Sequence, residues 1–99
     1  MACATDYYDD LETRLNGIIA TLEGIFTSME VREVAEFIGN REYGIGVETI
    51  VDIALEENKA LPQSVIDELR DICRTMDVAV PDGFDEIDVR SPRPLGPLG

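Results

Sequence analysis

Acidic side chains are the residues whose types and spacing most suggest a function for this chain. Glu48, Asp52 and Glu56 follow one another at intervals of four residues, with no basic residue between them. A helix would place them in one row, where like charges destabilise it by about 0.2–0.5 kcal/mol per pair. Two interpretations stay open: an ordinary solvated helix face, or a site that meets basic residues of a partner.

Other residues extend this row into a candidate partner-binding surface. Ile45 projects into the same helical sector, so that an apolar point lies among acids, as in an interface core with a polar rim. Phe37 falls outside the main apolar arc of its helix, and is either a buried aromatic touching a third helix or an exposed binding anchor. The candidate partner-binding residues are Glu33, Phe37, Glu42, Ile45, Glu48, Asp52 and Glu56.

Catalytic constellations are mostly missing from the sequence. The chain has no histidine, two widely separated cysteines and no glycine-rich phosphate loop, so the commonest general base, the usual zinc sites and the nucleotide fingerprints are absent. The chain has many carboxylates besides pairs such as Glu56-Glu57 and Asp9-Asp10, and no pair stands out as an acid/base dyad. We expect a protein that is not an enzyme and holds no cofactor.

The densest acidic segment, residues 82–88, is the nearest approach to a metal motif. A calcium loop needs acids at alternate positions, a central glycine and a terminal glutamate. The spacing of Asp82, Asp85, Glu86 and Asp88 does not match, which predicts a solvated acidic turn and no metal site.

Composition limits the partners. The 99 residues include 21 acids against 8 bases, a net charge of −13, and 44% are apolar, so the chain is one folding domain and not an acidic disordered tail. Such a charge argues against nucleic acid or an anionic membrane and favours a basic protein surface.

The beginning of the chain shows no basic leader and apolar h-region, and no apolar run reaches the length of a membrane span, so we expect a soluble, cytoplasmic protein. Cys3 lies in a segment expected to fray and Cys73 on the apolar face of a helix. A free thiol and a buried thiol are therefore expected in preference to a disulfide.

Helical periodicity dominates the chain and predicts helices over residues 6–26, 28–38, 42–57 and 62–76. Thr27 and Glu30 have capping-box spacing at the start of the second helix. Gly39 and Asn40 tolerate the left-handed conformation that often follows a helix, and are expected to close it. Pro62 is suited to the first turn of the last helix.

The third predicted helix has glycines at its entrance, Gly44 and Gly46. Because glycine costs an exposed helix interior about 0.8–1.0 kcal/mol relative to alanine, they imply either close approach of a neighbouring helix or backbone freedom at the turn.

The character of the chain changes after Val80, where a Pro-Asp-Gly turn leads to a proline-rich end. We expect an all-α fold, with a bundle of about four helices over residues 1–80 and an acidic, then proline-rich, largely irregular and flexible tail over residues 81–99. An arm folded over the bundle is the alternative, for which Phe84, Ile87 and Val89 would be the docking residues. Residues 78–80 carry a weak strand signal.

The segments Glu36-Phe37-Ile38, Arg41 to Ile50 and Leu61 to Ser64, with an acid-ended helix between the last two, resemble the small immunity proteins of the MafI type. Glu42, Tyr43, Gly44 and Glu48 match the family's core, Ile45 and Val47 are conservative replacements, and Gly46 stands where alanine is usual. The resemblance covers about residues 30–77, and neither the first helix nor the proline-rich end belongs to it.

This resemblance implies an all-helical protein that binds the toxic C-terminal domain of a cognate polymorphic or contact-dependent inhibition toxin of bacteria and blocks its active site or substrate approach. Many such toxins are nucleases with basic surfaces, which a strongly acidic chain suits. An acidic secretion chaperone or adaptor that binds a partner helix is the alternative. A nucleic-acid mimic is a third, weaker interpretation.

Overall fold

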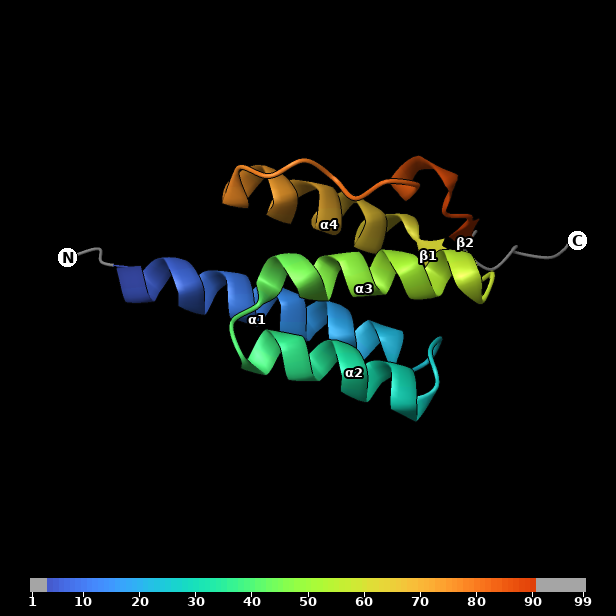
Figure 1. Ribbon diagram of the computed structural model, residues 1–99, viewed down its shortest axis with the longest axis horizontal. Coiled ribbons are helices and arrows are strands. Elements are labelled where there is room, and N and C mark those ends of the chain that lie inside the picture. Colours follow the sequence, from blue (N-terminus) through green and yellow to red (C-terminus); the bar gives the residue numbers. More distant parts are fainter. Residues whose placement is uncertain (1–3, 91–99) are drawn as a thin grey trace, which may run out of the picture.

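Four helices account for most of residues 4–90, the part of the chain that the computed structural model describes. They are α1 (Ala4–Leu22), α2 (Ser28–Gly39), α3 (Tyr43–Glu56) and α4 (Gln63–Met76). In Figure 1, α3 lies between α2 and α4, with α1 behind them. The predicted all-α fold is confirmed.

The connection between α1 and α2 is set by local chemistry. The first helix ends at Leu22, earlier than predicted, and a turn containing Gly24 carries the buried Phe26 back to the core. The predicted capping box is present: Thr27 Oγ1 accepts from the Glu30 amide at 3.2 Å, and the Thr27 amide donates to Glu30 Oε1 at 2.9 Å. Two backbone donors at the start of α2 are thereby satisfied.

The left-handed residue after α2 is Arg41, with φ of 63°, and not the predicted Gly39-Asn40 pair. Gly39 is still helical and Asn40 has φ of −92°. The Arg41 amide donates to Ile38 and the Glu42 amide to Phe37, the hydrogen bonds of a Schellman motif. Such a motif requires the left-handed conformation at Arg41, although a non-glycine residue adopts it at a cost.

The two glycines at the start of α3 prove to be different. A Cβ added to Gly46 would lie 2.5 Å from Ile38 Cδ1 and 3.7 Å from Phe37 Cβ, so this glycine allows α2 and α3 to approach closely. Among the described residues, a Cβ on Gly44 would meet nothing within 4 Å. The close-approach interpretation therefore holds for Gly46 and not for Gly44.

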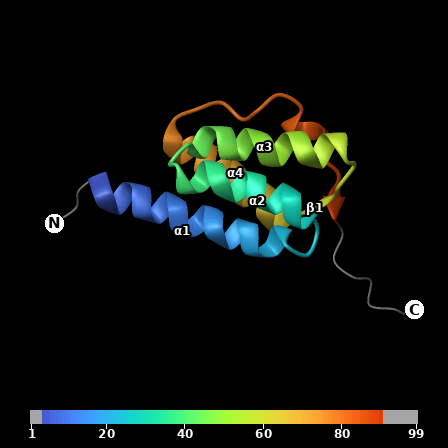
Figure 2. The ribbon, with the colours of Figure 1, turned by 60° about the horizontal axis from the view of Figure 1, so that its bottom comes forward.

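Residues 77–83, here called the strap, return from the end of α4 along α3 and α4 (Figures 1 and 2). They lead to a 3-10 turn at Phe84–Glu86 and to β2 (Val89–Arg90), which pairs in parallel with β1 (Leu61–Pro62). The Leu61 amide donates to the Asp88 carbonyl at 2.9 Å. These pairings fasten the end of the described chain to the entrance of α4.

The segment after residue 80 contributes to the core. Phe84 and Ile87 are 2% and 6% exposed, whereas Val89 is 48% exposed. The predicted division into a 1–80 bundle and a flexible tail is therefore wrong for residues 81–90, which match the alternative of a docked arm; residues 91–99 lie outside the described part. The weak strand signal at 78–80 is also wrong, because the described strands lie at β1 and β2.

One apolar core runs through the helices and the returning segment, and no polar or charged residue with a described side chain is buried in it. Its fully buried members come from every helix and from β1: Leu11, Leu15, Leu22, Val34, Ile38, Val47, Ile50, Val51, Leu61, Leu69, Ile72 and Cys73. None of the helices within residues 4–90 combines the length and apolarity needed to cross a membrane.

Candidate partner-binding surface

The acidic row predicted on α3 is present on its outer face. Glu48, Asp52 and Glu56 are all exposed, while the opposite side of α3 is buried in the core. None of them lies within ion-pair distance of a basic side chain in the described part of the chain. This row therefore has no counter-charge among the described side chains.

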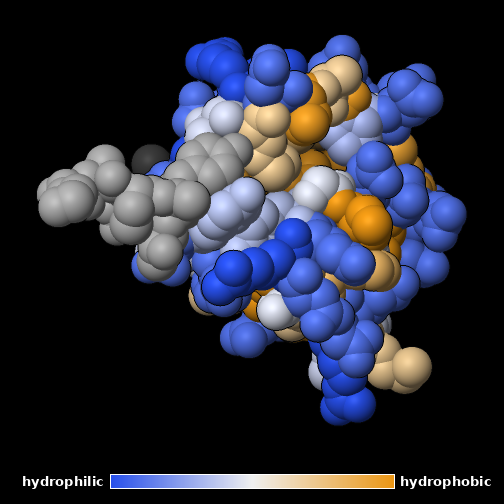
Figure 3. Space-filling view, turned by 60° about the vertical axis from the view of Figure 1, so that its left-hand side comes forward, coloured by the Kyte–Doolittle hydropathy of each residue, from blue (hydrophilic) through white to orange (hydrophobic). Residues whose placement is uncertain are grey.

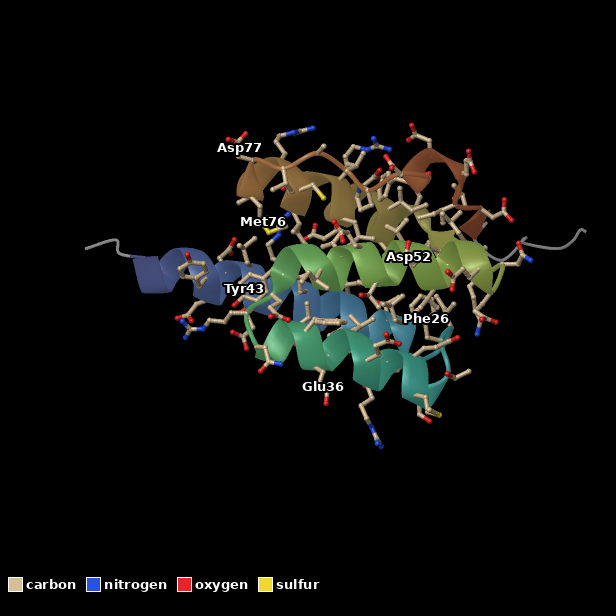
Figure 4. All side chains as sticks on the ribbon, in the orientation of Figure 1. Phe26, Glu36, Tyr43, Asp52, Met76 and Asp77 are labelled. Atoms are coloured by element: carbon tan, nitrogen blue, oxygen red, sulfur yellow. The ribbon has the colours of Figure 1, made fainter. Side chains whose placement is uncertain are left out.

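The strap adds an acid that the sequence alone did not join to this row. Glu48, Asp52, Pro81 and Asp82 line a shallow hollow of about 280 Å³. Figure 4 shows Asp52 on the side of α3 that faces the strap. We call Glu48, Asp52, Glu56 and Asp82 the acidic face. The acid density of residues 82–88 is visible in the sequence, but the position of Asp82 beside the α3 row depends on the return of the strap, which local spacing does not encode.

Most bases with described side chains are engaged with partners outside the acidic face, whereas Arg32 is exposed on α2. Arg14 Nε and Nη2 lie 2.6 Å and 2.7 Å from Glu68 and Asp71, and so join α1 to α4. Arg41 lies over the ring of Tyr8 at 5.9 Å. The remaining ion pairs between described side chains are Arg14 with Asp10, Lys59 with Glu30, Arg70 with Asp85, and Arg74 with Asp71.

Ile45 and Glu42 adjoin the acidic face at the beginning of α3. Ile45 is 45% exposed, and it lies one helical turn before Glu48. Glu42 is exposed at the N-cap position and makes no side-chain capping bond. An exposed aliphatic side chain bordered by acids is the combination predicted for an interface.

Glu33 and Phe37 occupy a different place. Phe37 is half-buried and its Cβ faces Gly46 of α3, which favours the buried-aromatic interpretation over the exposed anchor. Glu33 is exposed on α2. Because α2 lies on the side of α3 away from the strap (Figure 1), the structure does not bring these residues to the hollow at Asp82.

Titratable groups with shifted pKa values belong to the bundle. Burial raises the pKa of the Tyr43 hydroxyl, and Glu12, which accepts its hydrogen bond at 3.4 Å, raises it further. Burial also raises the pKa of Cys73, a free thiol, while Cys3 lies outside the described residues. Among residues 4–90, no group of three or more candidate ligands is placed to hold a metal ion.

No protein-family model, curated protein or solved structure matches this chain. The immunity-protein resemblance thus remains a prediction from the residues quoted above.

Proposed function

We propose that this protein is an immunity protein that binds and neutralises the C-terminal toxin domain of a cognate polymorphic or contact-dependent inhibition toxin. The toxin domain is a basic one, such as a nuclease, and the bound protein covers its active site or substrate-binding surface. The observation that carries this proposal is the acidic face, a run of exposed carboxylates with no counter-charge among the described residues.

The electrostatics support such a role. A surface of one sign raises the rate of encounter with a partner of the opposite sign by about 10–10³-fold, and salt weakens the effect. Desolvated apolar contacts such as Ile45 would then slow dissociation. An interface tight enough for neutralisation buries about 1,200–2,000 Å² in total, which extends beyond the acidic face to neighbouring parts of α3 and the strap.

Co-expression tests the proposal directly. The gene next to the one for this protein is examined for a large secreted protein with a small, basic C-terminal domain, and that domain is expressed with and without this protein. We expect survival only with this protein, and binding with a nanomolar or lower dissociation constant to the isolated domain. Cell death despite equal expression of both proteins would refute the proposal.

The adaptor alternative predicts binding without neutralisation, and a nucleic-acid mimic predicts competition across several unrelated targets. The hollow at Glu48, Asp52, Pro81 and Asp82 is lined mainly by acids, which favours contact with bases of a partner over burial of the apolar face of a helix.

A further inference from the structure

A second hollow lies where the beginning of α3 meets the end of α4 under the strap. Its volume is about 100 Å³, and its walls are mainly apolar, with Val47, Met76, Val78 and Ala79 among them. Gly44 and Glu48 are the exposed α3 residues that line it. Figure 3 looks onto this end of the molecule, where apolar surface is bordered by hydrophilic surface. We call this hollow the α3/α4 pocket.

Gly44 keeps one side of the pocket free of side-chain atoms. The other glycine of this turn, Gly46, is required by the approach of Ile38, but no described atom beyond the local helix backbone lies within 4 Å of a Cβ on Gly44. Packing among the described residues therefore does not explain a glycine here, although alanine would favour the helix by up to about 1 kcal/mol. The lack of a side chain at Gly44 leaves open space beside the apolar walls of the pocket.

Glu48 gives the pocket its charge. The nearby bases of α4 do not neutralise it, because Arg70 pairs with Asp85 and Arg74 with Asp71. The pocket therefore combines apolar walls with one uncompensated carboxylate. A side chain with an aliphatic stem and a cationic head complements both, because lysine and arginine bury their methylenes while the charged end stays at a polar rim.

The volume limits the size of the occupant. At about 100 Å³ the pocket is well below the about 300–1,000 Å³ of small-molecule sites. This is room for one inserted side chain and not for a helix face. Val78, one of the lining residues, is 49% exposed and would be covered by the surface that carries this side chain.

We propose that the α3/α4 pocket receives one lysine or arginine side chain of the basic partner, with its stem against Met76, Val78 and Ala79 and its cationic head at Glu48. This inference rests on the proposed function, since it assigns an anchor point within that interface. It also separates the roles of the acids: Glu48 holds an inserted cation, whereas Asp52 and Glu56 act at longer range.

Filling the pocket from Gly44 tests the proposal. Gly44→Leu should weaken binding to the cognate toxin domain by at least about 10-fold without lowering the urea midpoint, because the new side chain enters open space. Gly17→Leu is the matched control, since Gly17 is also helical, exposed and without an atom within 4 Å of its Cβ. Glu48→Gln should weaken binding in the parent protein and have little further effect beside Gly44→Leu.

A probe that needs no toxin gives the second readout. In an NMR titration, n-butylguanidinium should shift the amides of Gly44, Val78 and Ala79 saturably, and Gly44→Leu should abolish this. Guanidinium and n-butanol, which carry only the head or only the stem, should give weaker shifts. Shifts spread evenly over all acids would overturn the proposal.

The two proposals fail in different ways. If Gly44→Leu still neutralises the toxin domain and binds it with unchanged affinity, the pocket assignment is wrong and the immunity function stays intact. Saturable binding of n-butylguanidinium in the pocket, with no neutralisation of the neighbouring toxin domain, would overturn the immunity function and leave the chemistry of the pocket standing.

Discussion

Acids on two sides of this molecule are treated in opposite ways. At the seam between α1 and α4, Glu68 and Asp71 converge on Arg14, whose side chain is only 20% exposed. On the outer side of α3, Glu48, Asp52 and Glu56 face solvent without a basic neighbour among the described residues. The first group holds helices together, whereas the second has no comparable bond within the described chain.

The difference shows that net charge alone says little about where a partner binds. A protein at −13 has acids over much of its surface, but those already paired are poorly available to an external base. The like charges of the unpaired row on α3 repel one another, and a helix with acids and bases alternating at these positions would be more stable. The comparison therefore makes separate predictions for binding and for stability.

Reversing Glu48, Asp52 and Glu56 together to lysine should have the largest effect. Association with the toxin domain should slow by about 10–10³-fold at low salt, and the dependence of the rate on salt should weaken, because steering is lost. Stopped-flow association at several salt concentrations measures this. Reversal of Asp9, Glu23 and Glu36, exposed acids of α1, the following turn and α2, is the control. Equal slowing of association by both triple variants would contradict a special role of the acidic face.

Arg14→Met should instead affect stability. It leaves Glu68 and Asp71 facing one another without their shared base, so the free energy of unfolding should fall by about 1–2 kcal/mol, less than for a fully buried pair because solvent reaches the site. Urea denaturation measures the change. Arg74→Met, at a side chain that is 75% exposed, should cost under about 0.5 kcal/mol. Equal costs for the two variants would contradict the bridging role of Arg14.

Neutralising the acidic face should stabilise the fold slightly. Asp52→Asn removes the repulsion of Asp52 with Glu48 and with Glu56. The free energy of unfolding should therefore rise by about 0.4–1 kcal/mol at low salt and by less at high salt. Thermal unfolding at both salt concentrations measures it. A loss of stability would show that Asp52 has an internal role, and the surface interpretation would need revision.

The smallest effect concerns Glu30, a paired acid. The Thr27 amide, and then Lys59, lower the pKa of its carboxyl in the folded protein. A lowered pKa stabilises the fold above the unfolded-state pKa, and this contribution is lost as the pH falls through the folded-state pKa. The stability difference between the parent and Glu30→Gln should therefore shrink on acidification from neutral pH. Denaturation at several pH values measures it, with Glu33→Gln as the control on the same helix.

Local patterns in the sequence predicted much of the fold. The apolar periodicity located all four helices, and the Thr27-Glu30 spacing identified the start of α2. Boundaries were less accurate where hydrogen bonding over several residues decides them. Arg41 takes the left-handed position because the Schellman bonds require that residue to turn, although glycine or asparagine would be chosen from preferences alone.

Contacts between distant segments were the part that sequence patterns could not supply. The acidic row on α3 is a local feature and was predicted, but Asp82 joins it only because the strap folds back over α3. Likewise, the apolar residues Phe84 and Ile87 were recognised as able to dock, but the turn and prolines around them favoured a flexible tail. The apolar periodicity within one helix does not predict that a distant segment folds back onto that helix.

The return of the chain after α4 also affects the order in which the protein is completed during synthesis. The four helices leave the ribosome before Phe84 and Ile87, so the core that these side chains fill stays open until they emerge. The pairing of β1 with β2 likewise waits for residues made well after α4 begins. A pause in synthesis after α4 has emerged from the ribosome and before Phe84 does would therefore prolong the time during which a nascent helical bundle exposes apolar surface.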